Sequence, residues 1–301
     1  MISNELQTIG DFIRWGASRF NQAQLFFGHG TNNAIDEATV LVTHALHLSR
    51  ELPDILWHSN LTYSEKQKII KSFNTRITKN IPAPYITKEA WFANLCFYVN
   101  QDVLIPRSPI AELIEQKFEP WIDSDKFINM LDLCTGSGCI AIASLILAFS
   151  NVKIDATDIS SNALAVARKN INTYGLEQQI NLIKSDLFFN LDGKLYDLIV
   201  SNPPYVDEEE LQHMPSEYTY EPKIGFVAGT DGLLLVEQIL QEAVNYLTPD
   251  GILIVEVGLS QAHLVKKYPD IPFTWLEFQR GGEGVFLLTF EQLNNLKLKI
   301  L

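Results

Sequence analysis

Cysteine is scarce in this chain, and the sequence also lacks long apolar runs and a signal-like N-terminus. Three of the 301 residues are cysteines, Cys96, Cys134 and Cys139, and no two have CxxC spacing. An odd number without that spacing argues against disulfides and against a zinc site, so we expect no bound metal. No stretch of 18 uncharged apolar residues is present, which argues against a membrane-spanning helix. The first residues lack the basic, apolar and small-residue order of a signal peptide, and a cytoplasmic location is therefore expected.

Basic residues are also fewer than acidic residues, and this difference lies in one part of the chain. Residues 1–90 contain 9 Lys and Arg against 8 Asp and Glu, whereas residues 91–301 contain 14 against 28. The net charge of −13 therefore belongs to the second part. That part would repel a nucleic-acid backbone and attract a basic protein, although an acidic surface can also serve solubility alone. We expect a basic protein partner, no DNA and no membrane.

Two kinds of periodic pattern divide the sequence. Residues 5–80 place apolar side chains at helical spacing, and IPAPY at 81–85 is expected to break the helical region. The stretch around Asn100-Gln101-Asp102 is rich in aromatic and β-branched residues and predicts a β-hairpin. From residue 127, apolar strands alternate with helices, which predicts an α/β fold with a parallel sheet covered on both faces. The expected parts are a helical substrate-recognition domain (1–85), a hairpin connector (86–106) and a larger domain (107–301), which ends in an antiparallel hairpin.

A glycine-rich turn follows the first predicted strand of the larger domain. Its sequence, Asp132-Leu133-Cys134-Thr135-Gly136-Ser137-Gly138, permits a tight turn and lets a ligand approach the backbone. With Ala141 the spacing is G-x-G-x-x-A, and Asp158 lies 20 residues after Gly138, at the end of the second predicted strand. A carboxylate there can bind both hydroxyls of a ribose. The pattern indicates a nucleoside cofactor at the carboxyl edge of the sheet; the alternative is a turn with a structural role only.

The charge of Asp132 helps to choose between cofactors. NAD would bring a pyrophosphate to this turn and place it near the carboxylate. S-adenosylmethionine instead brings an ammonium and a sulfonium, which a carboxylate stabilises. Asp132 therefore favours S-adenosylmethionine, unless its carboxylate only caps backbone amides. Asp186, at the end of the third predicted strand, either accepts a hydrogen bond from the adenine amino group or is an ordinary turn residue.

Two prolines end the fourth predicted strand abruptly, in the sequence Ser201-Asn202-Pro203-Pro204-Tyr205. Strands one and four are neighbours in a doubly wound sheet, so this segment is expected beside the glycine turn. Methyl transfer from a sulfonium is an in-line displacement, and its main requirement is an aligned nucleophile. The Asn202 side-chain oxygen and the Pro203 carbonyl can each accept one N–H of a planar NH2 group, while Tyr205 packs over its π-system. A carboxamide and an exocyclic base amine both fit this description.

The segment Asn-Pro-Pro-Tyr, downstream of D-x-x-T-G-S-G and an acid, resembles the amino-group methyltransferases. These include DNA adenine-N6 and protein glutamine-N5 enzymes. Further stretches are similar to the protein-(glutamine-N5) methyltransferase family: VLIPRSP at 103–109, EP at 221–222, AGTDGL at 228–233 and GILIVEVG at 251–258. Within that family, Arg107-Ser108-Pro109-Ile110-Ala111-Glu112 departs from the R-P-x-T-E pattern of the release-factor branch. This departure, together with the stretches NELQTI, GHGT, PRSPIAELI and FTWLEF, resembles the branch that methylates the third large-subunit ribosomal protein.

The resemblance implies a Rossmann-like, seven-stranded class I methyltransferase domain. It implies methyl transfer from S-adenosylmethionine to the side-chain amide nitrogen of a glutamine in a ribosomal protein. Asp132, Gly136, Asp158 and Asp186 would line the cofactor, and Asn202 to Tyr205 would hold the glutamine. The full predicted cofactor set also contains Cys134, Thr135, Gly138, Ile159, Leu187 and Asn202. The predicted catalytic set is Asn202, Pro203, Pro204 and Tyr205.

Other functions and roles stay open at this point. A release-factor glutamine methyltransferase, an adenine-N6 methyltransferase and a non-catalytic S-adenosylmethionine-binding module are the alternatives; the acidity of the larger domain argues against the second. Residues 206–221 form either a solvated loop or an acidic rim that meets a basic substrate. Arg107 either reaches the substrate or pairs with an acidic neighbour. Phe97 and Tyr98 either face the site or pack in the core. His44 and His47 lack the partners of a metal site.

Overall fold

The computed structural model describes residues 5–123, 129–150, 152–191 and 193–300. The chain forms two compact units, each built from separate segments. The smaller unit contains Met1–Ala90, Val99–Gln101 and Pro215–Tyr220, and the larger contains Trp91–Tyr98, Asp102–Met214 and Glu221–Leu301. Among the described residues, no helix is both long and apolar enough to span a membrane.

The smaller unit consists of helices around an aromatic core. They are α2 (Ile9–Gln22), α3 (Ala34–Leu46), α4 (Asp54–Trp57), α5 (Tyr63–Lys79) and α6 (Ala83–Thr87). The core includes Phe12, Phe20 and Phe73, and the Phe20 and Phe73 rings meet edge to face at 5.1 Å. The break expected at 81–85 is confirmed at residues 80–82, between α5 and α6, although the helical conformation resumes at Ala83. Pro82 caps α6 and Pro84 lies in its first turn, where a missing N–H breaks no helical hydrogen bond.

A two-stranded hairpin connects the helices to the larger unit. It is formed by β1 (Glu89–Phe92) and β2 (Leu95–Tyr98), and its turn is at Ala93 and Asn94. The prediction of a hairpin is confirmed, but the turn expected at 100–102 is wrong. Both turn residues have positive φ, 47° and 60°, which matches the right-handed twist of the strands. Asn94 supplied a turn signal, but Asn100-Gln101-Asp102 was the more polar stretch.

The larger unit is built on a seven-stranded mixed sheet with the order β5-β4-β3-β6-β7-β9-β8. The first five of these strands are parallel, and β9 pairs antiparallel with both β7 and β8. This arrangement confirms the predicted α/β class and the antiparallel end. The strands are β3 (Asn129–Leu133), β4 (Lys153–Asp158), β5 (Ile180–Lys184), β6 (Tyr196–Ser201), β7 (Leu247–Glu256), β8 (Thr274–Trp275) and β9 (Val285–Thr289).

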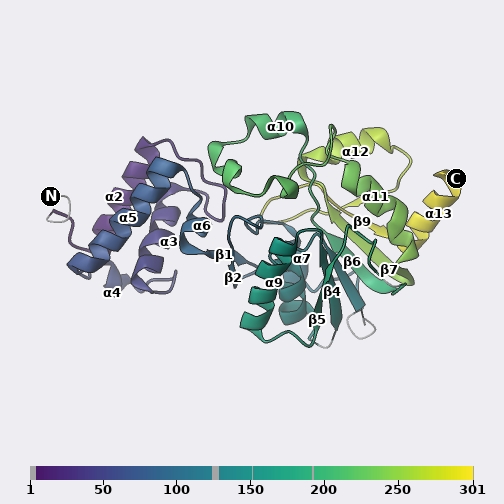
Figure 1. The fold of residues 1–301 in the computed structure, drawn as a ribbon, viewed down its shortest axis with the longest axis horizontal. Helices are drawn as coiled ribbons and strands as arrows, with labels where there is room; N and C mark the ends of the chain where they lie inside the picture. The colour runs from purple at the N-terminus through teal and green to yellow at the C-terminus, as the bar shows by residue number, and fades with distance from the viewer. Residues whose placement is uncertain (1–4, 124–128, 151, 192, 301) are drawn as a thin grey trace. The chain divides into compact units, whose positions relative to one another are not determined.

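Helices cover both faces of this sheet (Figure 1). One face packs under α7 (Ile110–Glu115), α8 (Cys139–Ala143) and α9 (Ser161–Tyr174), and the other under α11 (Leu234–Glu242), α12 (Gln261–Lys267) and α13 (Phe290–Ile300). Successive residues of β3 alternate between the two layers, with Met130 in one and Leu131 in the other. A short π-helical turn, Ser144–Ala148, extends α8, and α13 was not predicted from the sequence.

A buried ionic cluster joins three segments of the smaller unit. The Arg76 side chain donates from Nε to Glu37 at 2.6 Å and from Nη1 to Glu217 at 3.1 Å. Its remaining nitrogen donates to the Phe26 carbonyl at 2.7 Å. Burial raises the pKa of Glu37, and the charge and hydrogen bonds of Arg76 oppose that rise. Arg76 is therefore the cation that allows two carboxylates to stay buried.

Replacing Arg76 should destabilise the smaller unit strongly. We expect Arg76→Met to lower the free energy of unfolding by about 3–5 kcal/mol at pH 8, because both carboxylates lose their cation. The loss should shrink at pH 5, where the unpaired Glu37 can take up a proton. Urea unfolding followed by circular dichroism measures both values. Arg19→Met, an exposed change on α2, should stay within about 0.5 kcal/mol. A loss below 1 kcal/mol for Arg76→Met would contradict the assignment.

Candidate functional site

Two turns meet at the carboxyl edge of the large sheet because β3 and β6 are neighbours. Their parallel register pairs Leu133 with Ser201, the last residue of each strand. The Ser201 hydroxyl also donates to the Leu133 carbonyl at 3.0 Å. The glycine turn and the Asn202–Tyr205 segment therefore leave the sheet side by side. The adjacency that we expected from a doubly wound sheet is confirmed.

The glycine turn depends on left-handed backbone conformations. Cys134, Gly136 and Gly138 have φ values of +60°, +55° and +79°. A Cβ on Gly136 would meet nothing within 4 Å, so the space beside this residue is open. A Cβ on Gly138 would lie 3.2 Å from that of Ala167, so this glycine allows close packing on α9. Cys134 is a non-glycine residue in the same strained region, as is common at ligand sites.

The thiols of Cys134, in the turn, and of Cys139, the first residue of α8, are in surroundings that make them unreactive. Burial raises the pKa of the Cys134 thiol, and burial raises that of Cys139 to about 12. Both thiols are therefore protonated at neutral pH and are poor nucleophiles.

Asp132 is completely buried at the end of β3. Its Oδ2 accepts from the Thr135 hydroxyl at 2.6 Å and from the Ala141 amide at 3.2 Å. Its Oδ1 has no hydrogen-bond partner among the described residues. Burial raises its pKa to about 7, against the two hydrogen bonds, and the charge of Asp158 contributes to the rise. One oxygen thus caps the turn, while the other remains an acceptor for a ligand.

Asp158 lies at the end of β4, half-buried next to the same turn. Its Oδ2 accepts from the Gly136 amide at 3.0 Å, and its Oδ1 from the Ser160 amide at 2.8 Å. Burial raises its pKa, and these two bonds oppose the rise. Each oxygen keeps a lone pair, so the carboxylate can still accept from two hydroxyls. Ile159 follows with 47% of its surface exposed, an apolar side chain beside a polar one.

Asp186 and Leu187 follow β5, the strand beyond β4. Asp186 is exposed, whereas Leu187 is buried and has a positive φ of 41°. Register pairs Lys184 with Asp158, so Asp186 emerges at the same edge of the sheet. The edge therefore presents three acids: Asp132 near the end of β3, Asp158 as the last residue of β4 and Asp186 just after β5.

The Asn202–Tyr205 segment combines one unpaired amide with a fixed aromatic ring. The half-buried Asn202 side chain makes no hydrogen bond within the described parts of the chain, whereas Pro203 and Pro204 are buried. The Tyr205 hydroxyl donates to Glu256 at 2.8 Å. The Asn202 amide is available for a ligand, while the Tyr205 hydroxyl is occupied.

Glu256 and Ser108 complete this region and were missed by the sequence analysis. Glu256 ends β7 and is 5% exposed, and the Ser108 hydroxyl donates to its Oε2 at 2.5 Å. The missed signal is an acid at the end of an otherwise apolar strand, GILIVEV.

Arg107 pairs with an acidic neighbour, one of its two predicted roles. Its Nη1 lies 3.0 Å from Glu221 Oε2 and 3.1 Å from the Ile105 carbonyl. Glu221 is buried by this pairing, and Glu217 is buried in the ionic cluster of the smaller unit. Neither glutamate can therefore belong to an exposed acidic rim or a solvated loop. Earlier in the same stretch, α10 (Glu208–His213) is capped by Asp207.

The two hairpin aromatics have different environments. Phe97 is fully buried in the core, whereas Tyr98 is half-buried with the Lys169 ammonium 3.1 Å from its ring centroid. The buried amide of Asn170 binds both backbone groups of Tyr98 and donates to the Ser137 carbonyl at 2.8 Å. Asn170, on α9, thus connects the hairpin to the glycine turn.

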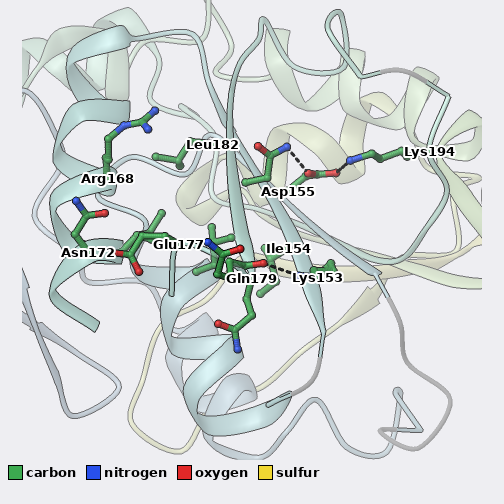
Figure 2. Close-up of a pocket in the computed structure, with 13 residues that line it drawn as sticks. Lys153, Ile154, Asp155, Arg168, Asn172, Glu177, Gln179, Leu182 and Lys194 are labelled. Atoms are coloured by element: carbon green, nitrogen blue, oxygen red, sulfur yellow. Dashed lines mark hydrogen bonds and ion pairs between the residues drawn. The ribbon is translucent and has the colours of Figure 1, made fainter. Parts of the chain in front are cut away.

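A pocket of about 330 Å³ lies elsewhere, beside β4, β5 and α9 (Figure 2). Its lining contains none of the candidate site residues. In Figure 2 the Lys194 side chain points at Asp155, to which it bonds at 2.8 Å. Within the described ranges, no cluster of three or more His, Cys, Asp or Glu could hold a metal ion.

The chain is similar to proteins that are named as methyltransferases. Residues 116–217 match the family described as the methyltransferase small domain. The "Ribosomal protein uL3 glutamine methyltransferase" of Francisella tularensis subsp. tularensis is 50% identical over 97% of this chain and 93% of its own. The protein of that name from Xanthomonas campestris pv. campestris is 48% identical over 97% and 94%. The hMettl16 catalytic domain, solved with the MAT2A 3′UTR hairpin 6, has a TM-score of 0.52 at 17% identity and covers 75% of this chain and 81% of its own. This likeness supports the fold alone.

The buried Asp132 should make stability fall as pH rises. Its pKa is about 7 in the folded chain against 3.8 as the ordinary value, so only the unfolded chain loses the proton between those values. Between pH 5.5 and 7 this should remove about 2 kcal/mol of stability, at 1.36 kcal/mol per pH unit. Comparing urea unfolding of the wild type and Asp132→Asn over this window isolates the effect. Parallel pH profiles for the two proteins would contradict it.

Proposed function

The chain belongs to the family of ribosomal protein uL3 glutamine methyltransferases, and we propose that it methylates a glutamine of uL3 with S-adenosylmethionine as donor. The methyl acceptor is the side-chain amide nitrogen of that glutamine. Relatives of this name match the chain almost end to end. The single observation that most supports the chemistry is the β3–β6 register, since it joins the unpaired Asn202 amide to the turn that holds the unpaired Asp132 oxygen.

The residues of the carboxyl edge fit S-adenosylmethionine. Asp132 Oδ1 is a buried acceptor without a partner in the described chain, and a bound ammonium would satisfy it. The Asp158 oxygens would accept from the ribose hydroxyls, and Asp186 from the adenine amino group. Thr135, Cys134 and the two glycines would form the turn around the methionine part, with Ile159 and Leu187 against the adenine. When bound, the cofactor supplies an electrophilic methyl carbon.

Asn202 and Pro203 would hold the nucleophile in line. The amide nitrogen of glutamine is weakly nucleophilic because its lone pair is conjugated with the carbonyl. The Asn202 Oδ1 and the Pro203 carbonyl each accept one N–H, which orients the nitrogen face. As the nitrogen bonds to the methyl carbon, its N–H groups become strongly acidic. A neutral oxygen acceptor is then enough to accept one of these protons and pass it on to water. The Tyr205 ring supports the flat amide, while Pro204 stiffens the turn.

Charge supports a basic protein substrate. Residues 91–301 have twice as many acidic as basic side chains. Attraction between this surface and a basic protein would speed their encounter. We further propose that the helical region 1–85 recognises the substrate, that 86–106 is a connector and that 107–301 is the catalytic domain. The three cysteines, none of which forms a disulfide, fit a reducing, cytoplasmic setting.

Transfer of labelled methyl groups tests the proposed reaction. We expect label from S-adenosylmethionine on a glutamine of uL3, located by mass spectrometry of the digested substrate. Release factor and DNA serve as the competing acceptors in parallel reactions. Label in release factor or DNA instead would identify one of the alternative methyltransferases. Cofactor binding without any transfer would indicate a binding module and would overturn the proposal.

Substituting Asn202 and Asp158 should separate transfer from cofactor binding. Asn202→Ala should lower kcat by at least about 100-fold, because the amide nitrogen loses an orienting acceptor. Its cofactor affinity should stay within a few-fold. Asp158→Ala should instead weaken cofactor binding by about tenfold or more, since a charged hydrogen bond is lost. Single-turnover kinetics and calorimetry measure the two effects. A collapse of cofactor binding in Asn202→Ala would refute its assigned role.

A further inference from the structure

Three side chains from distant parts of the larger unit form one hydrogen-bonded chain around the buried Glu256. Ser108 follows the connector, Glu256 ends β7, and Tyr205 closes the Asn202–Tyr205 segment. The Ser108 hydroxyl donates to Oε2 of Glu256 at 2.5 Å, and the Tyr205 hydroxyl donates to Oε1 at 2.8 Å. Each carboxylate oxygen therefore accepts one hydroxyl, and the two partners lie 148 and 51 residues away in sequence.

Burying the Glu256 carboxylate costs free energy of desolvation, which an apolar residue with only a packing role would avoid. Burial raises the pKa of its carboxyl, and the hydrogen bonds from Ser108 and Tyr205 and the charge of Arg107 oppose the rise. Apolar residues of similar volume usually stabilise a core at least as well as a buried charge. The surrounding strand, GILIVEV, is otherwise apolar. The acid at this place thus indicates a requirement other than stability.

The rest of Tyr205 is fixed as firmly as its hydroxyl. The Ser260 hydroxyl donates to the Tyr205 backbone carbonyl at 2.7 Å. A Cβ on Gly258 would lie 2.6 Å from the Tyr205 ring, and one on Gly232 would lie 2.3 Å from the Tyr205 carbonyl oxygen. Both glycines therefore let neighbouring backbone approach the tyrosine closely. Glu256 therefore binds the hydroxyl of a tyrosine whose backbone and ring are already held.

We propose that Glu256 and Ser108 are positioning residues for methyl transfer and act through the Tyr205 hydroxyl. The inference rests on the proposed function, in which Asn202, the Pro203 carbonyl and the Tyr205 ring hold the glutamine amide. Two prolines join Asn202 to Tyr205, and their fixed φ angles make the segment stiff. A shift of the tyrosine therefore moves the Pro203 carbonyl and Asn202 with it. The carboxylate also keeps the Tyr205 hydroxyl out of the reaction, so the ring alone faces the substrate.

Variants of Glu256 test this role with a built-in rescue. Glu256→Met removes both acceptors and should lower kcat by about 10- to 100-fold, as expected for a misplacement of about 1 Å. Glu256→Gln can accept from Tyr205 and donate to Ser108, and should stay within about fivefold of the wild type. The cofactor dissociation constant should change less than about threefold in both. Glu242→Met, an exposed change on α11 of the same unit, should leave kcat unchanged.

A double-mutant cycle shows whether Glu256 acts through the tyrosine. Tyr205→Phe keeps the ring and removes the hydrogen bond, so it should lower kcat to a similar degree as Glu256→Met. Combining the two should cost no more than the worse single change, because both break one interaction. Fully additive losses, or a Glu256→Met enzyme with wild-type kcat, would overturn the proposal. A wild type that transfers no label to uL3 would instead refute the proposed function.

Ser108→Ala gives an independent test that leaves the carboxylate in place. It removes one of the two hydroxyls on Glu256 and should lower kcat several-fold, with the cofactor dissociation constant unchanged. Should Glu256→Met fail to fold, as judged by circular dichroism, the cycle of Ser108→Ala with Tyr205→Phe replaces the first one. Non-additive losses in kcat would support the role, and additive losses would overturn it.

Discussion

The parallel pairing of β3 with β6 is the constraint on which the site depends. Parallel strands present their carboxyl ends at one edge, and this pair ends in register at Leu133 and Ser201. Two turns of different chemistry therefore leave the sheet together. One has glycines and a buried acid, and the other has an amide followed by two prolines. Any change that broke this pairing would separate the glycine turn from the Asn202 amide.

The same edge concentrates negative charge in a poorly hydrated place. Asp132 is the penultimate residue of β3, Asp158 and Glu256 end β4 and β7, and burial raises the pKa of each carboxyl. Asp158 raises the pKa of Asp132 further by repulsion. Apolar layers on both faces of the sheet must offset this unfavourable electrostatic free energy. A cationic ligand bound at this edge would relieve the repulsion, and that relief would add to its affinity.

The layout of the sheet was predictable, while the connections within the site were not. Apolar strands alternating with helices predicted the α/β class, and the glycine turn and the two prolines indicated where the chain leaves the sheet. The two-residue hairpin turn was missed because Ala93 is not a turn former, although its backbone is left-handed. The Ser108–Glu256–Tyr205 chain was missed because hydrogen bonds across 148 and 51 residues leave no local pattern. The choice between the two roles of Arg107 depends on where its acidic partner lies. Tertiary packing determines that position, and the sequence does not show it.

The segment after the candidate catalytic turn is held at both of its ends by buried carboxylates. At the start, Glu256 accepts from the Tyr205 hydroxyl inside the larger unit. At the end, Glu217 accepts from Arg76 inside the smaller unit, to which residues Pro215–Tyr220 belong. The stretch between these anchors contains α10 and the exposed acid Glu209. A substrate that engages the helical unit would therefore act on the same covalent segment that begins with Asn202. On the proposed function, substrate recognition and alignment of the amide would share one piece of chain, and this would give the return of that chain to the smaller unit a physical purpose.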